Sequence, residues 1–381
     1  MAFLKRSGGG RFSLRGINLR LLILCFLCSA YGCMLVFSAN YSAGSSMRGA
    51  MTQVGATIVG LLLAFFISRF DYEDICRAWP FIAGVSVLLV LLTFTPLGLN
   101  VSGTDDTAWL QIGFGKASLT LQPSELLKVA FIITFSLHLS AVRENVSEIR
   151  NVLFLCLHAL VPIGLIFLQG DDGTALVFLL MFAAMMFAAG LKWQYFAAAF
   201  AAIAAAVPLL WFNFLTDDKK GRILAILHPE EYIKTYGWQQ YQGIVQMGSG
   251  KLFGVGYLSG SNPHLFARNN DLVFTVAAEE FGYIGSLVLL LLLALLILEL
   301  WRCAKIARDT LGSLLCVGTM AMIGFQSIIN IGMNVRLLPI IGITLPFFSQ
   351  GGTSMLTLYL AIGLVLSVCY YSNVKSTTIH H

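Results

Sequence analysis

The residue of this sequence most suited to chemistry is Asp271, which stands where a long polar segment meets an apolar run. The segment, residues 222–271, contains many glycines but too many aromatic and apolar residues for a disordered linker. Loops of this length usually carry function when they are ordered. A carboxylate at the end of such a loop is a candidate general base, because it can accept the proton of an attacking hydroxyl. We therefore expect Asp271 to be catalytic.

Two more charged groups open earlier apolar runs. Glu125 and Lys128 are three residues apart and share one face of a helix. An ion pair that lowers the cost of two charges in an apolar setting explains them as well as a functional site does. Asp171 and Asp172 stand at the start of another helix. Capping explains one of them, and metal or substrate contact is the alternative for the other.

Glu279 and Glu280 lie about two helical turns beyond Asp271, inside the apolar run. Isolated carboxylates are costly at that depth, so at least one of them should face a wet cavity or pair with a cation. We assign Glu280 a role in supporting the site.

Composition indicates that these groups are positioned by membrane helices. Of 381 residues, 57% are hydrophobic and only 11% charged, whereas a soluble domain carries about 25% charged residues. The apolar runs are too long and alternate too little for an outer-membrane barrel. The predicted fold class is an all-α integral membrane protein of about ten transmembrane helices, with a large extracytoplasmic loop between spans seven and eight. The runs with the roughly 20 mostly apolar residues that a span needs are 20–39, 51–68, 78–96, 126–142, 152–169, 174–190, 194–214, 273–299, 310–333 and 353–371.

The basic residues orient this bundle. Ten spans put both termini on one side, and a cytoplasmic N-terminus places 14 of the 24 Lys and Arg residues in the cytoplasm. The chain then divides into a basic cytoplasmic segment (1–19), a single ten-helix membrane domain (20–371) with an external loop (215–272), and a short cytoplasmic tail (372–381). The basic segment is interpreted as a topology signal and not as a nucleic-acid-binding surface.

Two further segments should complete an external cleft. Residues 97–125 form an external loop, and we expect Pro123 or Ser124 to cap the helix that follows it. Residues 336–354 contain Pro339, Pro346 and several glycines, which break helices. Irregular backbone at membrane depth is tolerated where protein or a cavity covers it. The second segment should therefore be a re-entrant wall.

Five segments together resemble the shape, elongation, division and sporulation (SEDS) proteins, the RodA/FtsW family, over nearly the whole chain. They are LQPSELLK, GDDGTALVF, YQGIVQMGSGKLFGVG, NDLVFTVAAEEFGYIG and NIGMNVRLLPIIGITLPFFSQGGTS. The resemblance implies a peptidoglycan glycosyltransferase that polymerises lipid II on the outer face of the bacterial cytoplasmic membrane, with a class B penicillin-binding protein as its transpeptidase partner. Lipid II, that protein and membrane lipids are the expected partners.

The resemblance also implies roles for single residues. The essential loop aspartate of the family falls on Asp271, and the family's Glu and Lys fall on Glu125 and Lys128. Its Asp-x-Gly turn falls on Asp171, and Gln242 matches its loop. We assign substrate binding to Glu125, Lys128, Arg222, Gln242, Arg268 and Ser349, and supporting roles to Asp171, Glu280, Pro339, Gly351 and Gly352. A divalent cation, Mg²⁺ or Mn²⁺, is a further candidate for neutralising the leaving pyrophosphate.

The sequence departs from the family pattern at four places. Ala108 replaces an Arg that precedes Trp109, so another cation (Lys116, Arg222 or Arg268) should serve the pyrophosphate in its place. Asn269 and Asn270 replace His-Thr, Gln350 replaces Tyr, and Arg336 stands where a small residue is common.

Two rival functions remain open. One is a flippase for the lipid-linked precursor, although a carrier would more naturally place its charges near the midplane in broken-helix repeats. The other is a scaffold that recruits cell-wall enzymes, which would leave Asp271, Glu125 and Lys128 without a task. The sequence does not choose between elongation, division and sporulation.

Overall fold

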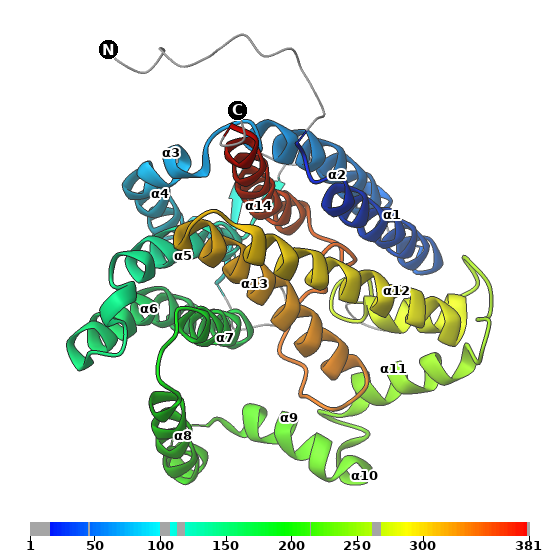
Figure 1. Ribbon diagram of the computed structural model, residues 1–381. Coiled ribbons are helices and arrows are strands. Elements are labelled where there is room, and N and C mark those ends of the chain that lie inside the picture. The colour runs from blue at the N-terminus through cyan, green and yellow to red at the C-terminus, as the bar shows by residue number, and fades with distance from the viewer. Residues whose placement is uncertain are drawn as a thin grey trace.

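The computed structural model describes residues 16–44, 46–99, 107–112, 119–213, 215–260 and 268–378 (Figure 1). The predicted candidate Lys116 and most of the basic N-terminal segment lie outside these residues. The helices are α1 (Leu19–Ser42), α2 (Arg48–Ile67), α3 (Tyr72–Arg77), α4 (Trp79–Leu92), α5 (Pro123–Ala141), a 3-10 turn (Arg143–Asn145), α6 (Ile149–Leu168), α7 (Asp172–Ala188), α8 (Trp193–Asn213), α9 (Asp217–Leu227), α10 (Pro229–Tyr232), α11 (Trp238–Ser249), α12 (Val273–Ile306), α13 (Thr310–Asn334) and α14 (Gly352–Thr378).

The long apolar runs form helices, as predicted. Within the described residues, eight helices (α1, α2, α5, α6, α8, α12, α13 and α14) are long and apolar enough to cross a membrane. Two shorter apolar helices, α4 and α7, occupy the third and sixth predicted spans. The all-α membrane class is confirmed, and the ten-span count stays a prediction.

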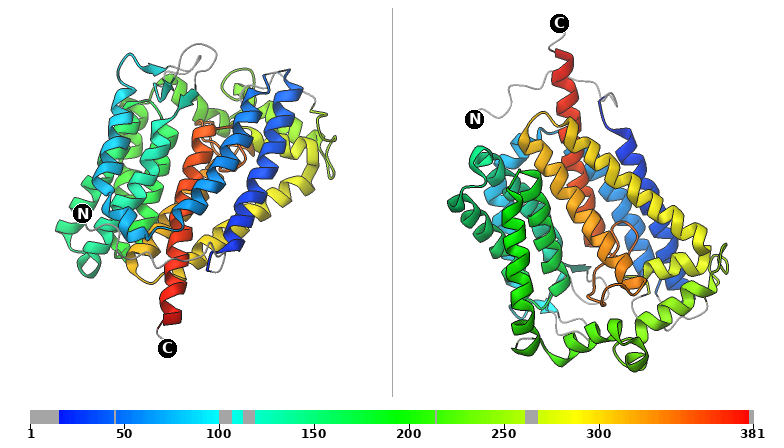
Figure 2. Two further views of the ribbon diagram at one scale, coloured as in Figure 1. Left: turned by 90° about the horizontal axis from the view of Figure 1, so that it is seen from above. Right: turned by 60° about the horizontal axis from the view of Figure 1, so that its bottom comes forward.

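The core lies where α5, α13 and α14 meet, because these three helices have most of their side chains buried. Around them, α14 packs on α2, α12 packs on both α1 and α13, and α7 packs on α13. By contrast, α8 has no buried residue and stands apart from the bundle (Figure 1). The start of α1 and the end of α14 lie at one end of the bundle, and α9 to α11 lie at the other (Figure 2). This arrangement agrees with the predicted sidedness of the long loop.

Both predicted loops contain secondary structure of their own. The 215–272 loop folds into α9, α10 and α11, and α11 packs against α12. The 97–125 loop carries a small antiparallel sheet of β1 (Gly98–Leu99), β2 (Trp109–Ile112) and β3 (Leu119–Leu121), in that order. The predicted capping by Ser124 is wrong. The N-cap of α5 is Gln122, and Pro123 takes the first helical position. The buried Ser124 hydroxyl has no hydrogen-bond partner among the described residues.

Helix α12 is interrupted at Gly282, whose φ of 67° lies in the region that glycine adopts without strain. The loop after α11 satisfies the backbone donors that the break frees. The Tyr283 N–H donates to the Lys251 carbonyl (2.9 Å), and the Ile284 N–H donates to the Leu252 carbonyl (3.2 Å). These two hydrogen bonds therefore attach the long loop to α12.

Residues 335–351 form the predicted irregular segment, hereafter the wall. It has no helix or strand, and its side chains Ile343, Phe347 and Phe348 are buried. Arg336, the second residue of the wall, has a φ of 63°. That value explains why a small residue, and above all glycine, suits this position.

Candidate functional site

Asp271 lies two residues before the start of α12, and α13 holds its backbone. Its carbonyl accepts hydrogen bonds from Asn330 Nδ2 (2.9 Å) and Asn334 Nδ2 (2.8 Å). These two asparagines are four residues apart and share one face of α13. Asn330 also donates to the wall carbonyl of Ile343 (2.7 Å). The backbone of Asp271 is thus fixed to α13 and, through Asn330, to the wall.

The wall also holds the two residues before Asp271. The Ser349 hydroxyl donates to the Asn270 carbonyl (2.6 Å) and accepts from the Leu345 N–H (2.7 Å). The Gln350 N–H donates to the Asn269 carbonyl (2.8 Å). A hydroxyl has one proton to donate, and the Ser349 proton is used inside the protein. Ser349 therefore shapes the site by holding Asn270.

Two departures from the family pattern meet in space. Asn269 Nδ2 donates to Gln350 Oε1 (3.0 Å), and Asn40 Nδ2 on α1 donates to the same oxygen (2.9 Å). Gly49 gives the Gln350 side chain its room, since a Cβ there would lie 2.3 Å from Oε1. The changes at positions 269 and 350 thus form one amide cluster, so they belong together as a matched pair.

A second carboxylate lies within electrostatic reach of Asp271. Asp171 caps α7 by accepting from the Thr174 N–H (2.9 Å), as the sequence predicts for one of the two adjacent aspartates. Gln122 Nε2 donates to its other oxygen (3.3 Å). Burial raises the pKa of Asp171, and the Thr174 hydrogen bonds and the charge of Lys128 partly offset that rise. Asp171 therefore interacts electrostatically with both Lys128 and Asp271.

The environment of Asp271 suits proton transfer. Burial raises the pKa of its half-buried carboxyl to about 6, with a further contribution from the charge of Asp171. A base whose pKa lies just below neutral pH is deprotonated there, yet can still hold a proton that it receives. The sequence identified Asp271 as a candidate base, but it did not predict the raised pKa of its carboxyl.

The predicted pair Glu125 and Lys128 is an ion pair buried at the start of α5. Lys128 Nζ lies 2.8 Å from Glu125 Oε1, and the two side chains are 0% and 5% exposed. Because Glu125 and Lys128 both act on Asp171, the pair belongs to the same group. We call Glu125, Lys128, Asp171 and Asp271 the site cluster.

Helix α9 brings cations to the edge of this cluster. Lys219 Nζ lies 2.5 Å from Asp172 Oδ2, next to Asp171 in the chain. Arg222 lies 2.9 Å from Asp218 and donates to the wall carbonyl of Ile340 (3.3 Å). Both cations are about half exposed, so they are accessible to an anionic ligand. Sequence reasoning missed Lys219, although the run DDKKGR that contains it is the most charged in the long loop.

Arg268 lies in a different group. Arg268 Nη2 is 2.5 Å from Glu279 Oε2 and 3.8 Å from Glu280 Oε1, with all three side chains almost fully buried. Ser38 on α1 donates to Glu280 Oε1 (2.5 Å). The expectation that Glu279 or Glu280 pairs with a cation is confirmed. We call Arg268, Glu279, Glu280 and Ser38 the closed cluster, because its one cation is held between two buried carboxylates.

The remaining predicted residues are Gln242, Pro339, Gly351 and Gly352. Gln242 is half-buried on α11, and no hydrogen bond of its side chain is seen among the described residues. Its neighbour Gln240, which sequence reasoning missed, donates to the carbonyls of Met333 (3.0 Å) and Leu338 (2.7 Å), next to Pro339. The Gly351 N–H donates to Gln53 Oε1 (3.0 Å), and Gly352 begins α14.

A metal ion would need ligands from the substrate as well as from the protein. No three His, Cys, Asp or Glu side chains come together as ligands within the part of the chain that the structure describes. Mg²⁺ is commonly held by one or two carboxylates together with substrate phosphates, and Asp271 and Asp171 fit that pattern. The divalent cation stays a prediction.

Comparison with known proteins places this geometry in a family. A family model described as cell cycle protein, covering FtsW, RodA and SpoVE, matches residues 18–374. Stage V sporulation protein E of Bacillus subtilis is 31% identical over 93% of this chain and 97% of its own length. Peptidoglycan glycosyltransferase MrdB of Escherichia coli is 27% identical over 94% and 95%, respectively. A probable peptidoglycan glycosyltransferase FtsW of Thioalkalivibrio is 34% identical over 92% and 89%.

Solved structures agree in fold. A chain from a peptidoglycan synthase complex, described as coordinating polymerization and crosslinking, matches with a TM-score of 0.79 and 28% identity. It covers 93% of this chain and 98% of its own. RodA of Thermus thermophilus matches with a TM-score of 0.67 and 27% identity over 93% and 97%. With a family match over nearly its whole length and relatives above 30% identity, this chain belongs to the FtsW/RodA/SpoVE family.

Proposed function

We propose that this protein is a peptidoglycan glycosyltransferase that polymerises lipid II into glycan strands on the outer face of the bacterial cytoplasmic membrane. The names of its relatives support the reaction class. The observation that carries the proposal is Asp271, whose backbone is fixed by Asn330 and Asn334 and whose carboxyl has a pKa of about 6.

The reaction needs a base on one side of the new bond and positive charge on the other. Asp271 takes the proton of the acceptor hydroxyl as its oxygen attacks the anomeric carbon of the donor. The bond from that carbon to the pyrophosphate oxygen breaks, and the lipid pyrophosphate leaves with the electron pair. This leaving group needs no proton, but its growing charge must be neutralised.

The cations nearest the site cluster are the candidates for that neutralisation. Lys128 is buried within it, and Arg222 and Lys219 lie at its exposed edge. Ala108, in the place of the family Arg, is buried at 3% exposure beside β2. We propose that Lys219 and Arg222 supply the charge that this position lacks.

We propose other roles for two residues that the sequence analysis assigned to substrate binding. Ser349 is a positioning residue, because its hydroxyl bonds to Asn270 and Leu345. Arg268 stabilises the closed cluster, because its charge already faces Glu279 and Glu280. Glu125 and Gln242 remain proposed substrate residues.

A partner follows from the family. The similar complex coordinates polymerization with crosslinking, and we propose that a class B penicillin-binding protein cross-links the strands made here. Both termini of this chain would lie in the cytoplasm, opposite the face that carries α9 to α11.

One assay tests the reaction against its rivals. Purified protein, alone or with its transpeptidase partner, is supplied with lipid II and scored for glycan chains on a gel. Chains should form with the wild type and not with Asp271→Asn, whereas the matched variant Asp217→Asn, an exposed aspartate on α9, should polymerise normally. An absence of chains in every combination, with transport of lipid II across vesicles, would replace the polymerase with a flippase.

A further inference from the structure

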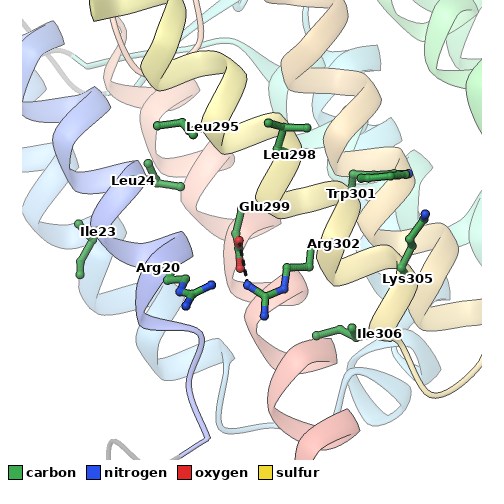
Figure 3. Close-up of a pocket in the computed structure, with 10 residues that line it drawn as sticks. All are labelled: Arg20, Ile23, Leu24, Leu295, Leu298, Glu299, Trp301, Arg302, Lys305 and Ile306. Carbon is green, nitrogen blue, oxygen red and sulfur yellow. Dashed lines mark ion pairs between the residues drawn. The ribbon is translucent and has the colours of Figure 1, made fainter.

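A groove of about 720 Å³ lies between the start of α1 and the end of α12 (Figure 3). The start of α1 lies at the end of the bundle opposite α9 to α11 (Figure 2). The groove is lined largely by aliphatic side chains. Leu295 and Leu298 on α12 and Ile23 on α1 are exposed, so the groove opens to the surroundings of the bundle. Nothing in the proposed reaction uses this groove.

Basic side chains crowd one end of the groove. Arg20 and Arg302 point toward the same space, from α1 and α12 respectively (Figure 3). Lys305 lies one turn further along α12. The groove has a single carboxylate, Glu299, and Asn18 Nδ2 already donates to it (2.7 Å). Three cations and one acid leave this end positively charged.

Among the described residues, the one acid of the groove, Glu299, forms an ion pair with Arg302 only (Figure 3). Arg302 Nη1 is 3.7 Å from Glu299 Oε2, too far for a hydrogen bond, and its side chain is 54% exposed. The Arg20 side chain forms no hydrogen bond or ion pair with another described residue. Two guanidinium groups that face one space repel each other, so an anion placed between them would be attracted by both.

The groove has a basic end and an aliphatic stretch, as a phospholipid has a headgroup and acyl chains. Trp301 is 48% exposed, with Lys305 Nζ 3.8 Å from its ring centroid, and Trp and Lys are typical of the headgroup level of a bilayer. Leu295 lies roughly 15 Å along the helix axis from Lys305, where acyl chains would lie. The cations are thus placed to contact a phospholipid headgroup, and the aliphatic side chains are placed to contact its acyl chains.

We propose that this groove binds one anionic phospholipid of the cytoplasmic leaflet. Its phosphate lies between Arg20 and Arg302, and an acyl chain follows the leucines of α12. Basic pockets between membrane helices on the cytoplasmic side bind anionic headgroups in this way. A membrane helix of a partner is the weaker occupant, because an apolar helix would leave the cations without a counter-charge. The inference rests on the proposed orientation and not on the proposed reaction.

The test is native mass spectrometry of the purified full chain with phosphatidylglycerol or phosphatidylcholine of identical chains added. The groove variant carries Arg20→Gln, Arg302→Gln and Lys305→Gln. The control variant carries Arg77→Gln, Arg150→Gln and Lys192→Gln, which remove the same charge from the same predicted side, away from the groove. Unfolding temperatures in neutral detergent verify that each variant is folded.

The wild type and the control should retain one phosphatidylglycerol in preference to phosphatidylcholine, and the groove variant should lose that preference by about tenfold or more, given the contribution of each basic residue near a lipid surface. A lipid with brominated acyl chains should quench the fluorescence of the wild type more than that of Trp301→Phe. Equal retention of the two lipids by the wild type, or unchanged preference in the groove variant, would overturn the proposal. So would displacement of the bound lipid by a co-purified transpeptidase.

Discussion

The site cluster and the closed cluster each include residues at or just before the first turns of α12, and they use the same kinds of side chain. In the closed cluster, Arg268 lies between Glu279 and Glu280, so its positive charge is neutralised within the protein. In the site cluster, three carboxylates (Glu125, Asp171 and Asp271) share one buried cation, Lys128, whereas in the closed cluster two carboxylates share Arg268. An excess of carboxylate is costly to stability and useful for chemistry, because it keeps a carboxyl close to the point of ionisation.

The largest effect on stability should come from opening the closed cluster. Arg268→Gln leaves two buried carboxylates without their cation and should lower the free energy of unfolding by about 3–5 kcal/mol. The apparent unfolding temperature in detergent measures this loss. Adding Glu279→Gln should restore part of it, and the half-exposed Arg222→Gln should change it by at most about 1 kcal/mol. Arg268→Gln with full stability and no activity would move Arg268 into the site cluster.

The next effect concerns the buried cation of the site cluster. Lys128→Gln should lower the polymerisation rate about 10- to 100-fold, because a positive charge near the leaving pyrophosphate is lost. The double variant Lys128→Gln with Glu125→Gln separates this role from simple pairing. The rate should stay low in the double variant. Recovery toward the wild-type rate would show that Lys128 serves only to neutralise Glu125.

A smaller effect is expected where the wall holds the site. Ser349→Ala removes the hydroxyl that bonds to Asn270 and Leu345, and leaving those groups unpaired costs about 1–3 kcal/mol. As a positioning residue, Ser349 should affect kcat with little change in KM for lipid II. Ser349→Thr keeps the hydroxyl and should recover part of the rate. A rise in KM alone, without a fall in kcat, would favour direct substrate contact.

The smallest effect is a shift in the pH profile. The charge of Asp171 raises the pKa of Asp271, so Asp171→Asn should let Asp271 lose its proton at a lower pH. The acid limb of the rate profile, near pH 6 in the wild type, should move down by less than about one unit, because burial remains the main cause of the raised pKa. Asn also caps helices well, so α7 should persist. Asp172→Asn is the control, and an upward shift would contradict the electrostatic account.

The sequence predicted what depends on local pattern. Runs of about 20 apolar residues place most of the helices, and the prolines and glycines of residues 336–354 predict the wall. Asp271 and the pair of Glu125 and Lys128 stand out because charges are rare in such runs.

What the sequence could not predict depends on partners distant in the chain. The anchoring of Asp271 by Asn330 and Asn334 could be predicted only by knowing that the start of α12 lies against the end of α13. The break at Gly282 is visible only once the loop after α11 supplies its hydrogen bonds. The sequence suggests Arg268 as a cation for the substrate, and its buried ion pairs with Glu279 and Glu280 led us to propose a structural role instead. The match between Asn269 and Gln350 likewise appears only when α12 and the wall are brought together.

The central claim is that Asp271 acts in the chemical step and not in holding lipid II. The direct test measures lipid II binding and glycan formation side by side for the wild type and Asp271→Asn, a variant of nearly the same shape. Binding should stay within about threefold while polymerisation falls by about a hundredfold or more, the scale expected for loss of a general base. Polymerisation near the wild-type rate, or a loss of binding that matches the loss of rate, would contradict the account.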